Sequence, residues 1–287
     1  IDYPFPKNPP FVDNNYNPVG TYRRSFEIPE TWKDKEVILN LSSVSGYARV
    51  FVNGKEAGMT KVAKSPSEFD ITPLLVKGKN QIAIQVFRWH DGSYLEDQDF
   101  WRLSGLEQDV FLYALPKTSI WDFFLKAGLE NNYKDGIFDA SVVLKNFNNT
   151  TQSGSLQLEI IPANVSKPVY SATKKFTTTD TPLNFQTIIK NVKSWSAETP
   201  NLYDVVLTLK DAAGKTLMLT SEQIGFREIE LKNAQLLVNG MPVLIKGVNL
   251  HIHDDVKGHV PSRKVMLKDL KLMKQNNLSL NGIRLVY

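Results

Sequence analysis

Hydrophobic and polar residues alternate over much of the first 115 positions, in short runs that turn residues interrupt. Alternation with period two places every second side chain on the same face of a strand, as in a half-buried sheet. Asn53-Gly54 follows one of these runs directly, and an Asn-Gly pair readily takes the positive φ angles of a tight hairpin turn. The pattern predicts a β-sandwich or barrel with strands at residues 22–28, 37–41, 47–52, 82–89 and 110–115.

Pro116 marks the expected end of this first domain, and period-two runs continue beyond it. Seven or so short strands in roughly 110 residues are typical of an immunoglobulin-like sandwich, although this one has no disulfide because the chain has no cysteine. The expected strands are residues 121–125, 138–144, 156–161, 185–192, 203–209 and 217–223.

The pattern changes after Gly225. Apolar runs at 236–238 and 243–248 flank Asn239-Gly240, which is a second hairpin signal. A helix is expected over 262–277 and a strand over 281–287. A single strand-helix-strand unit cannot close a parallel sheet, so we expect a truncated domain whose apolar face is covered from elsewhere.

The expected helix has a clear start and a clear apolar face. Ser262 is a suitable N-cap, and Met266, Leu270 and Met273 recur at steps of three and four residues.

Composition and charge exclude several classes of function. The 287 residues are 42% apolar and 22% charged, and the net charge of +4 is spread without a basic cluster, which argues against nucleic-acid binding. The absence of cysteine excludes disulfides, thiolate zinc sites and cysteine nucleophiles. No apolar run reaches the ~18 residues of a membrane span, so no membrane partner is expected.

Residues 89–105 are the most informative stretch for function, because they bring aromatic side chains and carboxylates together after a strand. Aromatic faces stack on sugar C–H surfaces, and carboxylates accept hydrogen bonds from sugar hydroxyls, so this loop suits carbohydrate binding. A solvated turn with buried aromatic anchors is the alternative interpretation, since acidic turns are common.

The loop resembles one in the sugar-binding domain of glycoside hydrolase family 2, in its lac-type β-galactosidases. Five further segments resemble that family in the same order along the chain. They are Asn8-Pro9-Pro10-Phe11-Val12, Pro66-Ser67-Glu68-Phe69-Asp70, Trp195-Ser196-Ala197-Glu198-Thr199-Pro200-Asn201-Leu202-Tyr203, the barrel-entry stretch from Gly225-Phe226-Arg227 to Lys246-Gly247-Val248-Asn249, and Met273-Lys274-Gln275-Asn276-Asn277, which resembles the end of the first barrel helix.

This resemblance implies a mainly β chain with three parts. Residues 1–116 would form a jelly-roll, galactose-binding-like β-sandwich whose first strands are missing, and residues 117–226 an immunoglobulin-like β-sandwich. Residues 227–287 would form the truncated start of a (β/α)8 TIM barrel that carries the catalytic domain.

The resemblance also implies site residues. Asp99 matches an aspartate that contacts galactose hydroxyls and a sodium ion, and a hard cation with oxygen ligands can bridge protein and sugar. His251 and Arg284 match substrate-pocket positions at the carboxyl ends of barrel strands. The family's glutamate between two histidines is Ile252 here, and the pocket histidine expected after Arg284 is absent.

His251 and His253 could instead hold a metal, because positions i and i+2 of a strand face the same way. A zinc site needs three or four protein ligands, and nothing with ligand spacing completes one. A structural histidine remains the other interpretation of His251.

Retaining glycosidases need two carboxyl groups roughly 5–5.5 Å apart. In the family these are glutamates on later barrel strands, and the Mg2+ ligands also lie in that later part. No catalytic residue is therefore expected within this chain, and the only cofactor expected in it is at most Na+ near Asp99. We expect a fragment of a bacterial retaining β-galactosidase, homo-oligomeric at full length and either periplasmic or cytoplasmic, that is inactive alone. The alternatives are a non-catalytic carbohydrate-binding module, or a β-glucuronidase or β-mannosidase of the same family.

Overall fold

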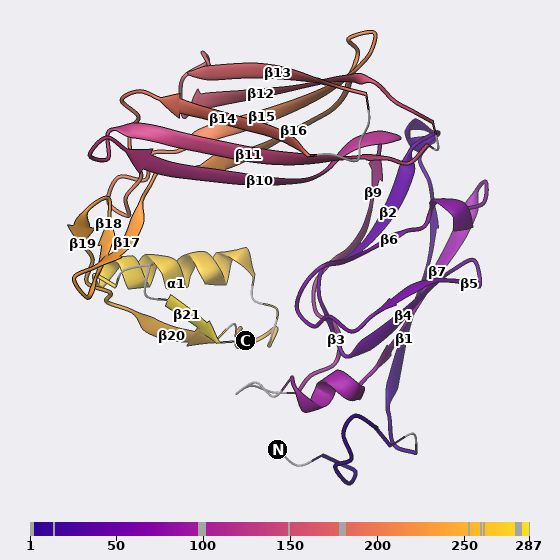
Figure 1. Ribbon diagram of the computed structural model, residues 1–287. Helices are drawn as coiled ribbons and strands as arrows, with labels where there is room; N and C mark the ends of the chain where they lie inside the picture. The colour runs from indigo at the N-terminus through magenta and orange to yellow at the C-terminus, as the bar shows by residue number, and fades with distance from the viewer. Residues whose placement is uncertain are drawn as a thin grey trace. The chain divides into compact units, whose positions relative to one another are not determined.

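The computed structural model describes residues 3–13, 15–96, 102–148, 150–177, 182–251, 253–258, 260, 262–278 and 283–286, without the side chains of 251 and 283–286. Two compact units make up the chain. The first contains residues 1–115, 248–276 and 283–287, and the second contains 116–247 and 277–282. Figure 1 shows the strands and the helix of both units.

The first 115 residues form two antiparallel sheets. One sheet has the order β1-β7-β4-β5, built from β1 (Val19–Glu27), β7 (Lys79–Phe87), β4 (Tyr47–Val52) and β5 (Lys55–Thr60). The other has the order β6-β2-β9, built from β6 (Ser67–Asp70), β2 (Glu36–Leu41) and β9 (Val110–Leu115). Short strands β3 (Val44–Ser45) and β8 (Gly105–Leu106) pair beside them, and three single turns, η1 (Glu30–Trp32), η2 (Thr72–Leu74) and η3 (Asp91–Tyr94), connect the strands.

Alternating residues of the two sheets meet in a common core, as the sequence pattern predicts. The core residues are Val37, Leu39 and Leu41 of β2, Ala48, Val50 and Val52 of β4, and Ile82, Ile84 and Val86 of β7. The β4–β5 hairpin turns at Asn53 and Gly54, whose φ angles are 51° and 79°. The predicted turn and the predicted sandwich are therefore confirmed.

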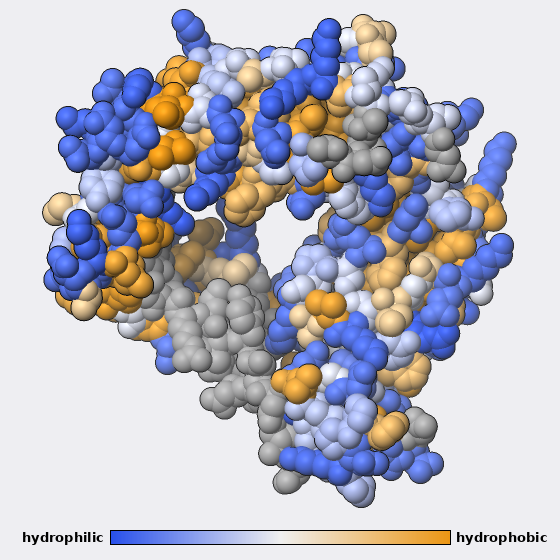
Figure 2. Space-filling view, viewed as in Figure 1, coloured by the Kyte–Doolittle hydropathy of each residue, from blue (hydrophilic) through white to orange (hydrophobic). Residues whose placement is uncertain are grey.

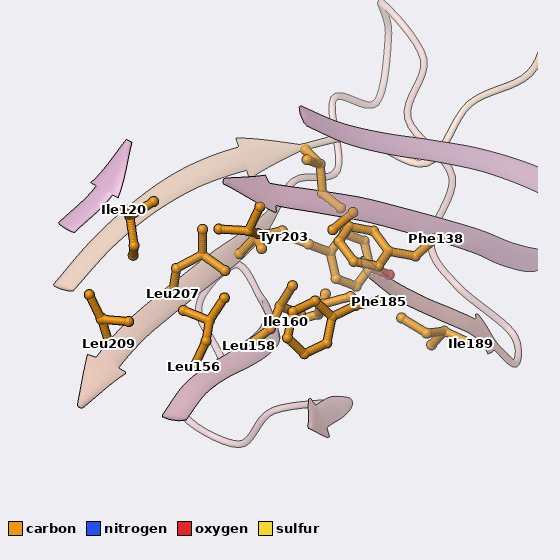
Figure 3. Packing of buried hydrophobic residues seen from close by; sticks show 14 of the residues in the cluster. Ile120, Phe138, Leu156, Leu158, Ile160, Phe185, Ile189, Tyr203, Leu207 and Leu209 are labelled. Carbon is orange, nitrogen blue, oxygen red and sulfur yellow. The ribbon is translucent and has the colours of Figure 1, made fainter. Parts of the chain in front are cut away.

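The second unit is the expected seven-stranded immunoglobulin-like sandwich, and Figure 1 shows its two sheets stacked face to face. One sheet contains β10 (Thr118–Glu130), β11 (Asp135–Asn146) and β14 (Leu183–Ile189) in that order. The other has the order β13-β12-β15-β16, built from β13 (Tyr170–Phe176), β12 (Gly154–Pro162), β15 (Tyr203–Asp211) and β16 (Thr216–Ile224). Phe138 and Phe185 meet the aliphatic side chains of β12 and β15 in its core (Figure 3).

Strand β13 was not expected from the sequence. It lies at the edge of its sheet, where four of its seven residues are exposed, and Lys174 and Lys175 interrupt any apolar alternation. An edge strand that buries so few side chains has no clear period-two signal.

The last segment begins with a small antiparallel sheet of β17 (Ile229–Lys232), β18 (Gln235–Val238) and β19 (Met241–Pro242). Asn239 and Gly240, with φ angles of 52° and 75°, form the predicted hairpin turn. The predicted strand at 243–248 is wrong for most of its length, because only Val248 belongs to a strand and Leu244 is 76% exposed. Exposed hydrophobic side chains recur on this part of the surface (Figure 2).

A strand-helix-strand unit follows, as expected. It consists of β20 (Val248–His251), α1 (Arg263–Gln275) and β21 (Ile283–Val286), and β20 pairs with β21 in parallel. The Ser262 hydroxyl accepts a hydrogen bond from the Val265 amide, so the N-cap prediction is confirmed. No helix in the described part of the chain is long and apolar enough to cross a membrane.

Candidate functional site

A cavity of about 650 Å³ lies in the first unit, beside the loop that the sequence singles out. Its walls come from β3, from the segment after β5, from the end of β7 with turn η3, and from the segment before β8. Glu96 and Arg102 both line it, so the two described ends of the Asp99 loop border the cavity. The loop predicted to bind sugar therefore adjoins a cavity whose volume is typical of small-molecule binding pockets.

His90 sets the local turn at this cavity. Its Nδ1 accepts a hydrogen bond of 3.3 Å from the Gly92 amide, while the Ser93 hydroxyl accepts one of 3.0 Å from the His90 amide. Nδ1 also lies 3.5 Å from Asp91 Oδ1, and Nε2 lies 3.4 Å from Glu96 Oε2. This reciprocal capping starts η3 and holds Glu96 near the buried histidine.

The aromatic side chains of the loop form part of an internal cluster. Trp89 is only 6% exposed, and the rings of Tyr3 and Phe5 lie 5.8 and 5.6 Å from its ring centre. The Tyr94 hydroxyl donates a hydrogen bond of 2.7 Å to the Phe11 carbonyl. Trp89 is thus a buried anchor for the N-terminal segment and offers no open face for a sugar. For this residue, the structure agrees with the alternative interpretation of the loop as a turn with buried aromatic anchors.

Charged groups surround this cluster. Lys61 Nζ lies 2.8 Å from Asp91 Oδ2, and its hydrogen bond lowers the pKa of that carboxyl. Arg102 donates to the Ser93 carbonyl and to the Tyr3 hydroxyl, at 3.1 Å each. These contacts hold the turn and the segment after the loop against the same aromatic cluster.

Glu107 accepts hydrogen bonds from the hydroxyls of Ser43 and Ser45, at 3.3 and 2.8 Å. Its carboxylate therefore lines the cavity in a fixed position.

The three residues predicted for the site lie outside what the structure describes at side-chain level. Asp99 is not among the described residues, so its sugar and sodium contacts remain predictions. His251 is the last residue of β20, and Arg284 is paired with Asn249 through the backbone register of β21. Both belong to adjacent parallel strands of the barrel-like segment, but their side chains are not described.

No group of three or more metal-ligating side chains occurs among the residues whose placement is described. His253 is exposed in that segment. The side chain of His251 lies outside the described residues, so the alternative metal site at His251 and His253 remains a prediction.

Sequence reasoning missed the cavity residues Lys61, Arg88, Arg102 and Glu107. Arg88 and Arg102 adjoin the tryptophans of the loop, which is a signal that could have been used. Lys61 is thirty positions from Asp91, and only the fold brings the two together.

Three family models match successive parts of the chain. Residues 1–116 match the model described as "Glycosyl hydrolases family 2, sugar binding domain", and residues 118–227 match "Glycosyl hydrolases family 2". Residues 229–286 match "Glycosyl hydrolases family 2, TIM barrel domain". The chain belongs to glycoside hydrolase family 2. The cavity and the Asp99 loop lie within its sugar-binding domain.

Among curated relatives of this family 2 chain, the β-galactosidases of Priestia megaterium and Pseudoalteromonas haloplanktis are each 40% identical over 292 aligned positions. These alignments cover 99% of this chain but only 28% and 27% of the two relatives. The chain thus spans little more than a quarter of their length. A β-glucuronidase of Bacteroides uniformis shares the fold, with a TM-score of 0.83 at 23% identity over 91% of this chain and 32% of its own.

Proposed function

We propose that this chain is the sugar-binding and scaffold portion of a retaining family 2 β-galactosidase, which hydrolyses terminal non-reducing β-D-galactosides. The observation that carries the proposal is the 40% identity to β-galactosidases along 99% of the chain. The cavity at the base of the Asp99 loop supports it, because it combines hydrogen-bond donors and acceptors as a sugar requires.

Each group would have a specific role. Glu96 and Glu107 present carboxylate oxygens to sugar hydroxyls, and Lys61 presents a donor. Asp99 would contact galactose and hold Na+, whose oxygen ligands can include a sugar hydroxyl. His251 and Arg284 would contribute from the carboxyl ends of β20 and β21, where substrate sites of TIM barrels form.

Hydrolysis itself needs a nucleophilic carboxylate and a second carboxyl as general acid and base. The described carboxylates that line the cavity already have structural partners, since Glu96 Oε2 lies 3.4 Å from His90 Nε2 and Glu107 accepts hydrogen bonds from two serines. Among the residues that the structure describes, no group of three or more metal-ligating side chains could hold Mg2+. We therefore expect the 287-residue polypeptide to bind sugar without cleaving it.

The test is turnover of a chromogenic β-galactoside by the pure polypeptide, produced in a host that lacks β-galactosidase. We expect no turnover, together with galactose binding in the millimolar range that Asp99→Ala abolishes. Turnover at an enzyme-like rate would contradict the division of roles proposed here.

A non-catalytic carbohydrate-binding module is the second candidate, favoured by the cavity within the sugar-binding domain. Other family 2 specificities are also compatible with the fold, which a β-glucuronidase shares. Adding a separately expressed chain with the remaining barrel of a β-galactosidase relative discriminates these functions. Restored hydrolysis of a galactoside favours the galactosidase, restored hydrolysis of a glucuronide favours the glucuronidase, and sugar binding without any rescue favours the module.

Self-association is a further part of the proposal. We expect the full-length protein to be a homo-oligomer, and light scattering on it would measure the number of subunits directly.

A further inference from the structure

Cationic groups gather around one buried indole in the cavity wall. The guanidinium carbons of Arg88 and Arg102 lie 5.3 and 5.6 Å from the ring centre of Trp89. Arg88 Nη2 also donates a hydrogen bond of 3.1 Å to the Arg102 carbonyl, which brings the two arginine residues into direct contact. The face of the indole attracts such cations and so partly stabilises them at this position.

The indole N–H points to a missing acceptor. Trp89 Nε1 is buried and has no hydrogen-bond partner among the residues that the structure describes, although Trp89 lines the cavity. Burying a donor without a partner is unfavourable, so a donor of this kind favours a ligand that brings an acceptor.

The charges of the cavity wall favour an anion. Four lining side chains are cationic, namely Lys61, Lys64, Arg88 and Arg102, and two are carboxylates, Glu96 and Glu107. Lys61 pairs with Asp91, which leaves three cations against the two carboxylates of the lining. Arg88 is exposed, and its described hydrogen bond goes to a neutral carbonyl. Its positive charge therefore remains accessible to a ligand from solvent.

We propose that the cavity binds an anionic oxygen group, a carboxylate or a sulfate, carried by an acidic saccharide. The Arg88 guanidinium supplies parallel N–H donors, a geometry that fits both kinds of anion, and Trp89 Nε1 supplies a further donor. The identification of the carrier as a saccharide rests on the proposed function. The anion site itself rests only on the cavity and its donors.

The experiment is calorimetric titration of the 287-residue polypeptide with sodium galacturonate, with galactose as the neutral comparison, at constant ionic strength. Galacturonate is expected to bind about 10-fold more tightly than galactose, because a hydrogen bond to a charged group contributes more than a neutral one. Sodium sulfate is expected to compete with galacturonate, and added sodium chloride to weaken its binding. Equal affinities for galacturonate and galactose would overturn the proposal.

Arg88→Gln is the decisive variant, since Arg88 is exposed and the change should leave the fold intact. We expect it to lower galacturonate affinity about 10-fold and to leave galactose affinity unchanged. Arg49→Gln is the matched control, because Arg49 lies on β4, which pairs with β7 directly before Arg88, but binds Glu56 outside the cavity. Equal effects of the two variants would refute the site.

Asp99→Ala separates this inference from the proposed function. Loss of galactose binding in Asp99→Ala with retained sulfate binding supports both. Sulfate binding that depends on Arg88, in a protein with no affinity for either sugar, supports the anion site and contradicts the sugar-binding function.

Discussion

Tyr133 donates a hydrogen bond to Glu230, with 2.5 Å between the phenolic oxygen and Oε2. The two residues are 97 positions apart, and the bond ties the β10–β11 turn to strand β17. Nearby, the Asn239 side chain accepts from the Glu228 amide and donates to the Trp195 carbonyl. The hairpin at the start of the barrel segment is therefore fastened to the immunoglobulin-like sandwich by polar contacts.

Removal of the Tyr133–Glu230 contact should loosen this hairpin. The pKa of Tyr133 is raised, chiefly because its neutral phenol donates to Glu230, so the contact is present below the usual tyrosine range and is lost as pH rises through the raised pKa. We expect faster amide hydrogen exchange in β17 and β18 for Glu230→Gln at neutral pH. Glu222→Gln, an exposed change on β16, is the control, and equal exchange in the two variants would contradict the assigned role.

Gly240→Ala should destabilise the second unit more than Gly54→Ala destabilises the first. Both glycines have positive φ, which costs a non-glycine residue about 1–2 kcal/mol. A Cβ at Gly240 would lie 2.5 Å from the Tyr133 ring, whereas one at Gly54 meets nothing within 4 Å. Urea unfolding of the two variants measures the difference, and equal losses of stability would show that the Tyr133 ring moves aside freely.

Asp135 should make the second unit sensitive to acid. Its pKa is lowered to about 2, first by the hydrogen bond from Lys190, then by the Asn191 amide and by Asn131. A lowered pKa stabilises the fold above the ordinary carboxyl range near 4, and that contribution is lost as pH falls towards 2.

The corresponding measurement compares Asp135→Asn with the unaltered chain in urea at several pH values. We expect the variant to be less stable at pH 7 and the difference to vanish near pH 2. Asp139→Asn, on the outer face of the same strand, is the control. A difference that persists unchanged at pH 2 would mean that Asp135 acts through packing alone.

Phe138→Ala should cost about 3–5 kcal/mol, because the ring is fully buried between the two sheets of the second unit and its removal leaves a cavity. Phe124→Ala, on the neighbouring strand β10, should change stability by less than about 0.5 kcal/mol, because that ring is 70% exposed. Thermal unfolding of both variants tests this contrast. A similar loss in both would show that Phe124 is covered in solution.

Local patterns in the sequence predicted most of the elements. The buried alternation of Ile82, Ile84 and Val86, the Asn-Gly turn at Asn53 and the Ser262 N-cap all depend on neighbours only a few residues away. Edge strand β13 escaped prediction because burial, which produces the alternation, is slight there.

By itself, the sequence determined the class of fold, the turns and the family, since periodicity, positive-φ residues and motif order are properties of short segments. Only the tertiary structure decided that Trp89 is a buried anchor, that Lys61 pairs with Asp91, and that cations collect in one cavity. The physical reason is that strand register and packing choose which distant side chains meet, and a period-two pattern states only which face a residue occupies.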